Sequence, residues 1–176
     1  MDILALKQLV IGRLQDVESL GTQTDLVDFQ GLGENLFMFS IAYFIGCPFK
    51  DGARGTEMDP ITKKPFYDCY GLFMAIYEHI YGIILPDVLV SCFDTIEINR
   101  LYNIRKSDWH KIEAPQEPCA VAIRFDVKNP RYVNHFGVYV GNGRFIHTTA
   151  KTGSIISSIY DRFYSRHIEG FYKYGE

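Results

Sequence analysis

Residues 68–81 read Asp-Cys-Tyr-Gly-Leu-Phe-Met-Ala-Ile-Tyr-Glu-His-Ile-Tyr, and the interpretation of the whole chain starts from them. Apolar residues recur at helical spacing from Leu72 to Ile83, which predicts a helix with one buried face. Asp68 is suited to cap this helix, so Cys69 lies in its first turn. There the unpaired N–H groups and the helix dipole favour a thiolate, which makes Cys69 a candidate nucleophile. The alternative is that Cys69 is a small buried hydrophobe.

Length and composition indicate an ordinary globular protein. The 176 residues are 47% apolar and 22% charged, which suits one domain with a sizeable core. A net charge of -3 and the absence of a Lys/Arg cluster argue against a nucleic-acid partner. No apolar run is long enough to span a bilayer, so we expect no membrane partner. Residues 1–7 show no secretory leader pattern, and we expect cytoplasmic synthesis, with any action outside the cell reached in a phage particle or by a non-Sec route.

The four cysteines give no sign of a metal or redox motif. They stand at positions 47, 69, 92 and 119, and no two of them form a Cys-x-x-Cys pair. That spacing argues against a zinc site and against a thioredoxin-type motif. We therefore expect reduced thiols, no metal and no cofactor.

Helical patterns come first along the chain and strand patterns follow. We predict helices over residues 3–20, 34–45 and 91–105, and loops over 25–33 and 50–66. Strands are predicted at 109–112, 119–125, 135–140, 144–149, 154–158 and 170–174. Helices followed by a strand meander indicate an α+β fold. Residues 1–35 are interpreted as an N-terminal helical extension and residues 36–176 as the functional domain.

Two histidines flank a predicted hairpin turn. With a two-residue turn at Asn142-Gly143, paired positions sum to about 285, which makes His135 and His147 diagonal neighbours at best. Whether they share a face of the sheet depends on bulges. With His147 orienting His135, the two would complete a set of nucleophile, base and orienter around Cys69. The alternative is that each is an ordinary core or surface histidine.

Four segments together resemble one known family. Residues 45–49 (Ile-Gly-Cys-Pro-Phe) lie where the family has Gly-x-Pro-Tyr, and residues 68–72 lie where it has Asp-Cys-Ser-Gly-Leu. Two further segments follow in the family's order. They are residues 82–86 (Gly-Ile-Ile-Leu-Pro) and residues 134–147 (Asn-His-Phe-Gly-Val-Tyr-Val-Gly-Asn-Gly-Arg-Phe-Ile-His). Over about residues 36–174 the chain resembles the NlpC/P60 cysteine peptidases, a papain-like family that cuts peptidoglycan stem peptides. Its aromatic C-terminal segment is most similar to members encoded with phage tail genes.

The resemblance implies a papain-like α+β fold, with the nucleophile at a helix N-terminus packed against an antiparallel sheet. It also implies roles for four residues: Cys69 as nucleophile, His135 as base, His147 as the orienting third member, and Asp68 as the group that binds the free amine of a stem peptide. The implied reaction is hydrolysis of an amide, between γ-D-glutamate and a diamino acid, through a thioester. Neither a cofactor nor a metal is implied.

Three departures from the family pattern point to altered specificity. Phe49 replaces a tyrosine, so one hydroxyl donor is missing unless Tyr43, Tyr67 or Tyr70 supplies it. Tyr70 itself replaces a serine beside the nucleophile and should reshape the substrate site. We therefore count Phe49 and Tyr70 with Asp68 as substrate-binding positions. Residues 118–120 read Pro-Cys-Ala where Pro-Gly-Asp is usual.

Two other functions stay open from the sequence. The chain could be a phage-tail or cell-surface binding module that keeps the fold with weak hydrolysis or none. It could also be an acyltransferase that uses the same thioester chemistry. High reactivity of Cys69 would favour the enzymes, and ordinary reactivity would favour the binding module.

Overall fold

The computed structural model describes residues 41–175 of the protein. The predicted helix over residues 3–20, the loop over 25–33 and the domain boundary at residue 35 lie outside the described residues. Of the predicted helix over 34–45, residues 41–45 are described. Residues 41–44 are helical, and Ile45 already lies in the turn that follows.

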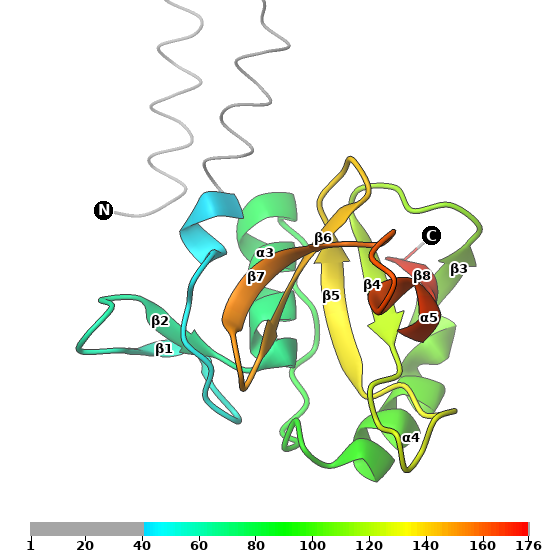
Figure 1. The fold of residues 1–176 in the computed structure, drawn as a ribbon, viewed down its shortest axis with the longest axis horizontal. Helices are drawn as coiled ribbons and strands as arrows, with labels where there is room; N and C mark the ends of the chain where they lie inside the picture. The colour runs from blue at the N-terminus through cyan, green and yellow to red at the C-terminus, as the bar shows by residue number, and fades with distance from the viewer. Residues whose placement is uncertain (1–40, 176) are drawn as a thin grey trace, which may run out of the picture. The chain divides into compact units, whose positions relative to one another are not determined.

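A six-stranded antiparallel sheet forms the centre of the described fold (Figure 1). Its strand order is β3-β8-β4-β5-β6-β7, so the last strand of the chain lies between β3 and β4. The strands are β3 Trp109–Ile112, β4 Cys119–Ile123, β5 His135–Tyr139, β6 Arg144–Thr149, β7 Gly153–Ser158 and β8 Ile168–Tyr174. All six predicted strands are present with ends within about two residues of those expected. Together with the helices, the sheet confirms the α+β fold class.

Helix α3, Cys69–Tyr81, is the predicted helix that begins at the cysteine. Asp68 caps its N-terminus, and Gly82 ends it in the left-handed conformation at a φ of 69°. That conformation is accessible to glycine without a steric penalty. The buried face of α3 includes Leu72 and Ile76, and the helix packs against β5 and β6 (Figure 1). The cysteine is thereby held at the end of a rigid element.

The predicted helix over residues 91–105 is shorter than expected. Helix α4 spans Thr95–Arg105, not residues 91–105, and is followed by the 3-10 turn η1, Lys106–Asp108. Asp94 caps α4, while the preceding Ser91 and Cys92 bond to Asp51 in a distant loop. Because those tertiary bonds hold the backbone before Asp94, the helix begins four residues late. A short helix, α5 Tyr164–His167, precedes β8.

The predicted loop over residues 50–66 was wrong in part, because it contains a β-hairpin. Strands β1, Arg54–Met58, and β2, Pro65–Tyr67, form a two-stranded antiparallel sheet beside α3 (Figure 1). The turn between them is stabilised by Asp59, whose carboxylate accepts hydrogen bonds from Ile61 and Thr62. Strand β1 is mostly exposed and its residues are mostly polar. It therefore lacks the alternation of apolar and polar residues by which a strand is predicted from sequence.

The six-stranded sheet is buried on both of its faces near the middle. One face carries Ala120, Ala122 and Val138 into the core that α3 covers. The opposite face carries Val121, Ile123 and Phe145 into a second, smaller cluster. Within residues 41–175, no helix has the length and apolar character to cross a membrane.

Candidate active site

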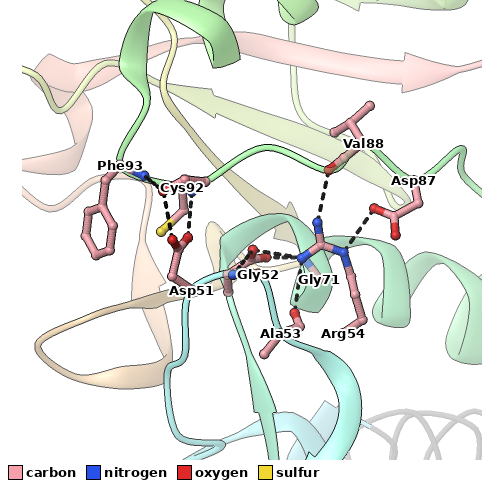
Figure 2. Close-up of polar contacts among 11 residues, drawn as sticks. Asp51, Gly52, Ala53, Arg54, Gly71, Asp87, Val88, Cys92 and Phe93 are labelled. Atoms are coloured by element: carbon pink, nitrogen blue, oxygen red, sulfur yellow. Dashed lines mark hydrogen bonds and ion pairs between the residues drawn. The ribbon is translucent and has the colours of Figure 1, made fainter.

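Asp68 holds the start of α3 against two other segments of the chain. One carboxylate oxygen accepts a hydrogen bond from the Gly71 N–H at 2.6 Å. The other accepts from the Gly52 N–H at 3.0 Å and forms an ion pair with Arg54 at 2.7 Å. Figure 2 shows Gly52, Arg54 and Gly71 close to one another. Asp68 is 1% exposed, so its buried carboxylate is paired with one cation, Arg54, and bonded by two backbone N–H groups.

Gly71 allows the hairpin segment to approach this closely. A Cβ at this position would lie 2.1 Å from the backbone oxygen of Ala53. No side chain fits there, so the glycine in the Asp-Cys-Tyr-Gly segment is required by packing. The loop before β1 is thus fixed directly beside Cys69.

Cys69 is the first residue of α3 and is almost completely buried, at 6% exposure. Burial raises the pKa of its thiol to about 12, and the neighbouring Asp68 carboxylate adds to the rise. The backbone groups of Tyr70 and Phe136 and the Arg54 guanidinium act in the opposite direction. The sequence predicted a thiolate favoured by the helix N-terminus, but desolvation and the adjacent carboxylate outweigh it, and the thiol is neutral at pH 7.

His135 and His147 form a direct hydrogen bond. Nε2 of His135 lies 2.9 Å from Nδ1 of His147, and the two rings are nearly perpendicular. Nε2 of His147 lies 3.0 Å from Oγ of Ser157, which extends the chain of bonds by one residue. Among residues 41–175, Nδ1 of His135 has no recorded hydrogen-bond partner. That nitrogen is available as a base if the proton of His135 resides on Nε2.

The register of β5 and β6 brings the two histidines to the same face. Val138 pairs with Ile146 and Tyr139 with Phe145, so paired numbers sum to 284 and not to the predicted 285. The connection is a three-residue loop, Gly141–Gly143, and all three residues have a positive φ. A shift of one residue reverses the face to which every side chain points. The two-residue turn was therefore wrong, and the correct loop makes the histidine pair possible.

Aromatic rings enclose the histidine pair. Phe125 stacks on His135 with ring centroids 4.7 Å apart, and Phe145 stacks on His147 at 4.9 Å. Tyr164 packs edge-on against His147. Burial lowers the pKa of His147 to about 4 and, with the neighbouring His147, lowers the pKa of His135 well below its usual value. Both rings are therefore neutral at pH 7.

Cys69, at the start of α3, lies beside the first residues of β5, the strand that begins with His135. The thiol is beside the backbone of Phe136, the residue that follows His135. No hydrogen bond joins the thiol to either imidazole within the described part of the chain. The assignment of Cys69, His135 and His147 as a catalytic set stays a prediction, with the two histidines joined and the thiol next to their strand.

The other predicted substrate-binding residues occupy different places. The Tyr70 hydroxyl donates to the Pro86 carbonyl at 2.8 Å, so it is already engaged. Burial raises the pKa of Tyr70 to about 12. Phe49 packs against Phe93 and forms a bridge with Tyr67. Asp68 and Tyr70 line an apolar cavity that Cys69 also lines, whereas Phe49 does not.

The sequence analysis missed Arg54 and Ser157. Ser157 lies two residues after Ile155, which pairs with His147, so it shares the face of the histidine pair. The turn signal at residues 151–153 could have located it once the register was known. Arg54 carried no local signal, because its partners Asp68, Asp87 and Val88 are distant in sequence.

No metal centre is present among the described side chains. Within residues 41–175, no three His, Cys, Asp or Glu residues gather as ligands would.

Comparison with known proteins gives consistent matches. The model of the NlpC/P60 family matches residues 46–173. The chain is 30% identical over 105 residues to a probable endopeptidase NlpC homolog of Haemophilus influenzae, covering 60% of this chain and 48% of that protein. It is 27% identical over 127 residues to murein DD-endopeptidase MepH of Escherichia coli, covering 72% and 40%. The chain therefore spans less than half the length of these two relatives.

Solved structures share the fold. An NLP/P60 family protein similar to a lipoprotein, from Staphylococcus aureus, matches with a TM-score of 0.53 at 21% identity, covering 90% of this chain and 45% of that one. An NlpC/P60 family protein from Bacillus cereus matches with a TM-score of 0.52 at 19% identity, covering 80% and 39%.

Proposed function

Because the chain belongs to the NlpC/P60 family, we propose that it is a cysteine peptidase that hydrolyses an amide bond in peptidoglycan stem peptides. The observation that carries the proposal is the bonded series His135–His147–Ser157. Its free nitrogen belongs to His135, and the backbone of the next residue, Phe136, lies beside the Cys69 thiol. Two relatives with endopeptidase names support the substrate class, one of them a murein endopeptidase. The bond we propose joins γ-D-glutamate to a diamino acid.

The proposed first step is attack by Cys69 on the scissile carbonyl. The thiol and both imidazoles are neutral at the outset, so the proton passes to Nδ1 of His135 as the sulfur–carbon bond forms. The imidazolium of His135 keeps its Nε2–H on Nδ1 of His147, which in turn donates Nε2–H to Ser157. Each nitrogen of the pair then has one role, and the tautomer of His135 is set by its neighbour.

The proposed second step is departure of the amine. The oxyanion collapses, the carbon–nitrogen bond breaks, and His135 returns its proton to the leaving nitrogen, which leaves a thioester on Cys69. Water attacks the thioester with His135 again as base and releases the acid. The backbone N–H of Cys69 has no acceptor within the helix because it lies in the first turn, so it is the proposed donor to the oxyanion.

Asp68 is the proposed site for the substrate amine, in addition to its existing bonds. Its carboxylate already accepts from Gly52, Arg54 and Gly71. An amine would therefore bind as a further donor to a carboxylate whose position is already fixed.

A binding module is the second candidate, and the raised pKa of Cys69 favours it. A buried neutral thiol is less nucleophilic than an exposed one. A protein of this kind would bind a peptide and release it unchanged.

Incubation with a purified stem peptide and mass analysis of the products separates the two functions. The enzyme is expected to cleave the peptide and to accumulate, on acid quenching, a mass increment on Cys69 that hydroxylamine removes. Cys69→Ala and His135→Ala should abolish cleavage, and His110→Ala, which changes an exposed histidine, should not. Peptide that stays intact with the wild-type protein, or cleavage that survives Cys69→Ala, would overturn the proposal.

A further inference from the structure

The three groups of the proposed chemistry are buried in this conformation. Asp68 is 1% exposed, Cys69 is 6% exposed and His135 is 7% exposed. The cavity beside Cys69 has a volume of about 90 Å³. Pockets that hold small-molecule ligands usually measure about 300–1,000 Å³. A stem peptide therefore does not fit against the thiol as the chain stands, and part of the cover over Cys69 has to move.

One wall of this cavity is the segment that connects α3 to α4. Residues 86–93, which we call the strap, form neither helix nor strand. Val88, Val90 and Cys92 of the strap line the cavity together with Cys69. The residues that alternate with them are exposed. The strap thus presents one set of side chains to the cavity of the nucleophile and the other set to solvent.

The strap is attached to distant parts of the fold through side chains. Within residues 41–175, no backbone–backbone hydrogen bond joins the strap to a segment that is distant in sequence. Its hydrogen bonds to such segments instead involve the side chains of Asp51, Arg54 and Tyr70. Segments that lack the regular bonds of a helix or a sheet open at a lower free energy than the core elements do. The strap is therefore the part of the cover that can move without unfolding the sheet.

Arg54 anchors the strap at the end near α3. Its guanidinium lies 3.0 Å from the Asp87 carboxylate and donates to the Val88 carbonyl, also at 3.0 Å. The same guanidinium pairs with Asp68 at 2.7 Å. Because the buried Asp68 carboxylate would lose its counter-charge if Arg54 left, this anchor stays in place.

Asp51 anchors the opposite end of the strap (Figure 2). Its carboxylate accepts hydrogen bonds from the Ser91 hydroxyl at 2.7 Å and from the Cys92 N–H at 2.8 Å. Asp51 and Ser91 are both exposed, and Phe93 beside them is 66% exposed. Water can replace hydrogen bonds at an exposed carboxylate, so their net contribution is small. The Asp51 end is therefore the end of the strap that is released more readily.

We propose that the strap is a lid over Cys69, held closed by Asp51, and that its Asp51 end lifts to admit the peptide. The role as a gate for a peptide rests on the proposed function, whereas the covering of the thiol does not. Asp51 is then a positioning residue: it acts through the strap and contacts neither the substrate nor the reacting atoms.

The test measures access to the Cys69 thiol and requires no hydrolysis. The full chain reacts at pH 8.5 with iodoacetamide or with the bulkier, uncharged N-iodoacetylglucosamine, and peptide mapping follows Cys69 separately from the other thiols. Each rate is divided by the rate of the same reagent with glutathione. The ratio of the bulky to the small reagent on one thiol does not depend on its thiolate fraction, so it reports access.

The wild type should show a low ratio, because the bulky reagent requires the open strap. Asp51→Ala is expected to raise the ratio about tenfold, because it removes two hydrogen bonds to a charged group. Ser91→Ala removes one of them and should raise the ratio about threefold. Asp51→Asn keeps an acceptor oxygen and should raise the ratio less than Asp51→Ala does. Equal rates of the two reagents in the wild type, or an unchanged ratio in Asp51→Ala, would overturn the lid.

Two controls separate movement of the strap from general loosening. Asp59 also accepts hydrogen bonds from backbone N–H groups and from a hydroxyl, but in the turn between β1 and β2, so Asp59→Ala should leave the ratio unchanged. Cys119 in β4 is 0% exposed and should stay equally protected in every variant. A matching rise of the ratio in Asp59→Ala, or a parallel rise in the reactivity of Cys119, would contradict a local lid.

The two proposals fail separately. If Asp51→Ala opens Cys69 to the bulky reagent but no stem peptide is cleaved, the lid stands and the hydrolase does not. If cleavage depends on Cys69 but the ratio is the same in wild type and Asp51→Ala, the hydrolase stands and the lid does not.

Discussion

Nε2 of His135 lies 2.9 Å from Nδ1 of His147, and this bond determines which nitrogen of His135 can act as a base. If His135 donates from Nε2, its Nδ1 is unprotonated, and His147 must then donate from its own Nε2 to Ser157. The proton positions along the three residues are therefore coupled. A change at the far end of the series alters the base that faces the substrate.

Removal of His147 should lower activity more than removal of Ser157. His147→Ala is expected to lower kcat about 10²-fold, because the orientation and tautomer of His135 are lost. His147→Asn should recover part of this loss, because an amide oxygen can accept the Nε2–H of His135. Ser157→Ala should cost about threefold to tenfold. The readout is kcat for a stem peptide at several pH values, and equal losses for all three variants would contradict an ordered series.

The histidine pair should make the protein less stable in mild acid. The pKa of His147 is lowered to about 4 in the folded protein and is about 6.5 when unfolded, so between these values only the unfolded chain takes up the proton. Stability contributed by neutral His147 is therefore complete above about pH 7 and is lost as the pH falls towards 4. Between these pH values the free energy of unfolding of the wild type should fall by about 1.4 kcal/mol per pH unit relative to that of His147→Asn. The measurement is urea unfolding of both proteins at several pH values. If the free energies of unfolding of the two proteins changed with pH in parallel, His147 would not be buried in its neutral form.

Cys69 should react as a neutral thiol in the free protein. Its pKa is raised to about 12, so the thiolate fraction and the rate with iodoacetamide should rise steadily with pH through 9. No plateau is expected below pH 7, and His135→Ala should change the profile little. A fast plateau below pH 7 that disappears in His135→Ala would instead demonstrate a thiolate–imidazolium pair in the resting protein.

Arg54 should be more important for stability than a matched surface arginine. Arg54→Met leaves the buried Asp68 carboxylate without its counter-charge, which should cost about 3 kcal/mol in urea unfolding. Arg100→Met removes an exposed arginine that pairs with Glu97 three residues away and should give no measurable change. Combining Arg54→Met with Asp68→Asn should restore part of the loss, since the unpaired charge is removed. Equal effects of Arg54→Met and Arg100→Met would show that the buried ion pair is not stabilising.

Much of the fold could be predicted because its signals are local. Asp68 before an apolar run and Gly82 after it bounded α3, and alternating apolar residues located the six main strands. The β1–β2 hairpin was missed because an exposed two-stranded ribbon has no buried face to create a pattern. The start of α4 was missed because Asp51, some forty residues earlier, holds the backbone before it.

The sequence by itself determined the fold class, the position of Cys69 at a helix start, and the candidate histidines, since each depends on neighbouring residues. Only the tertiary structure decided that His135 and His147 share a face, because a one-residue difference in the β5–β6 loop sets that parity. Tertiary packing also decided the ion pair of Asp68 with Arg54 and the apolar cavity beside Cys69. These features join segments far apart in the chain, and their energies come from burial and close approach, which local sequence does not encode.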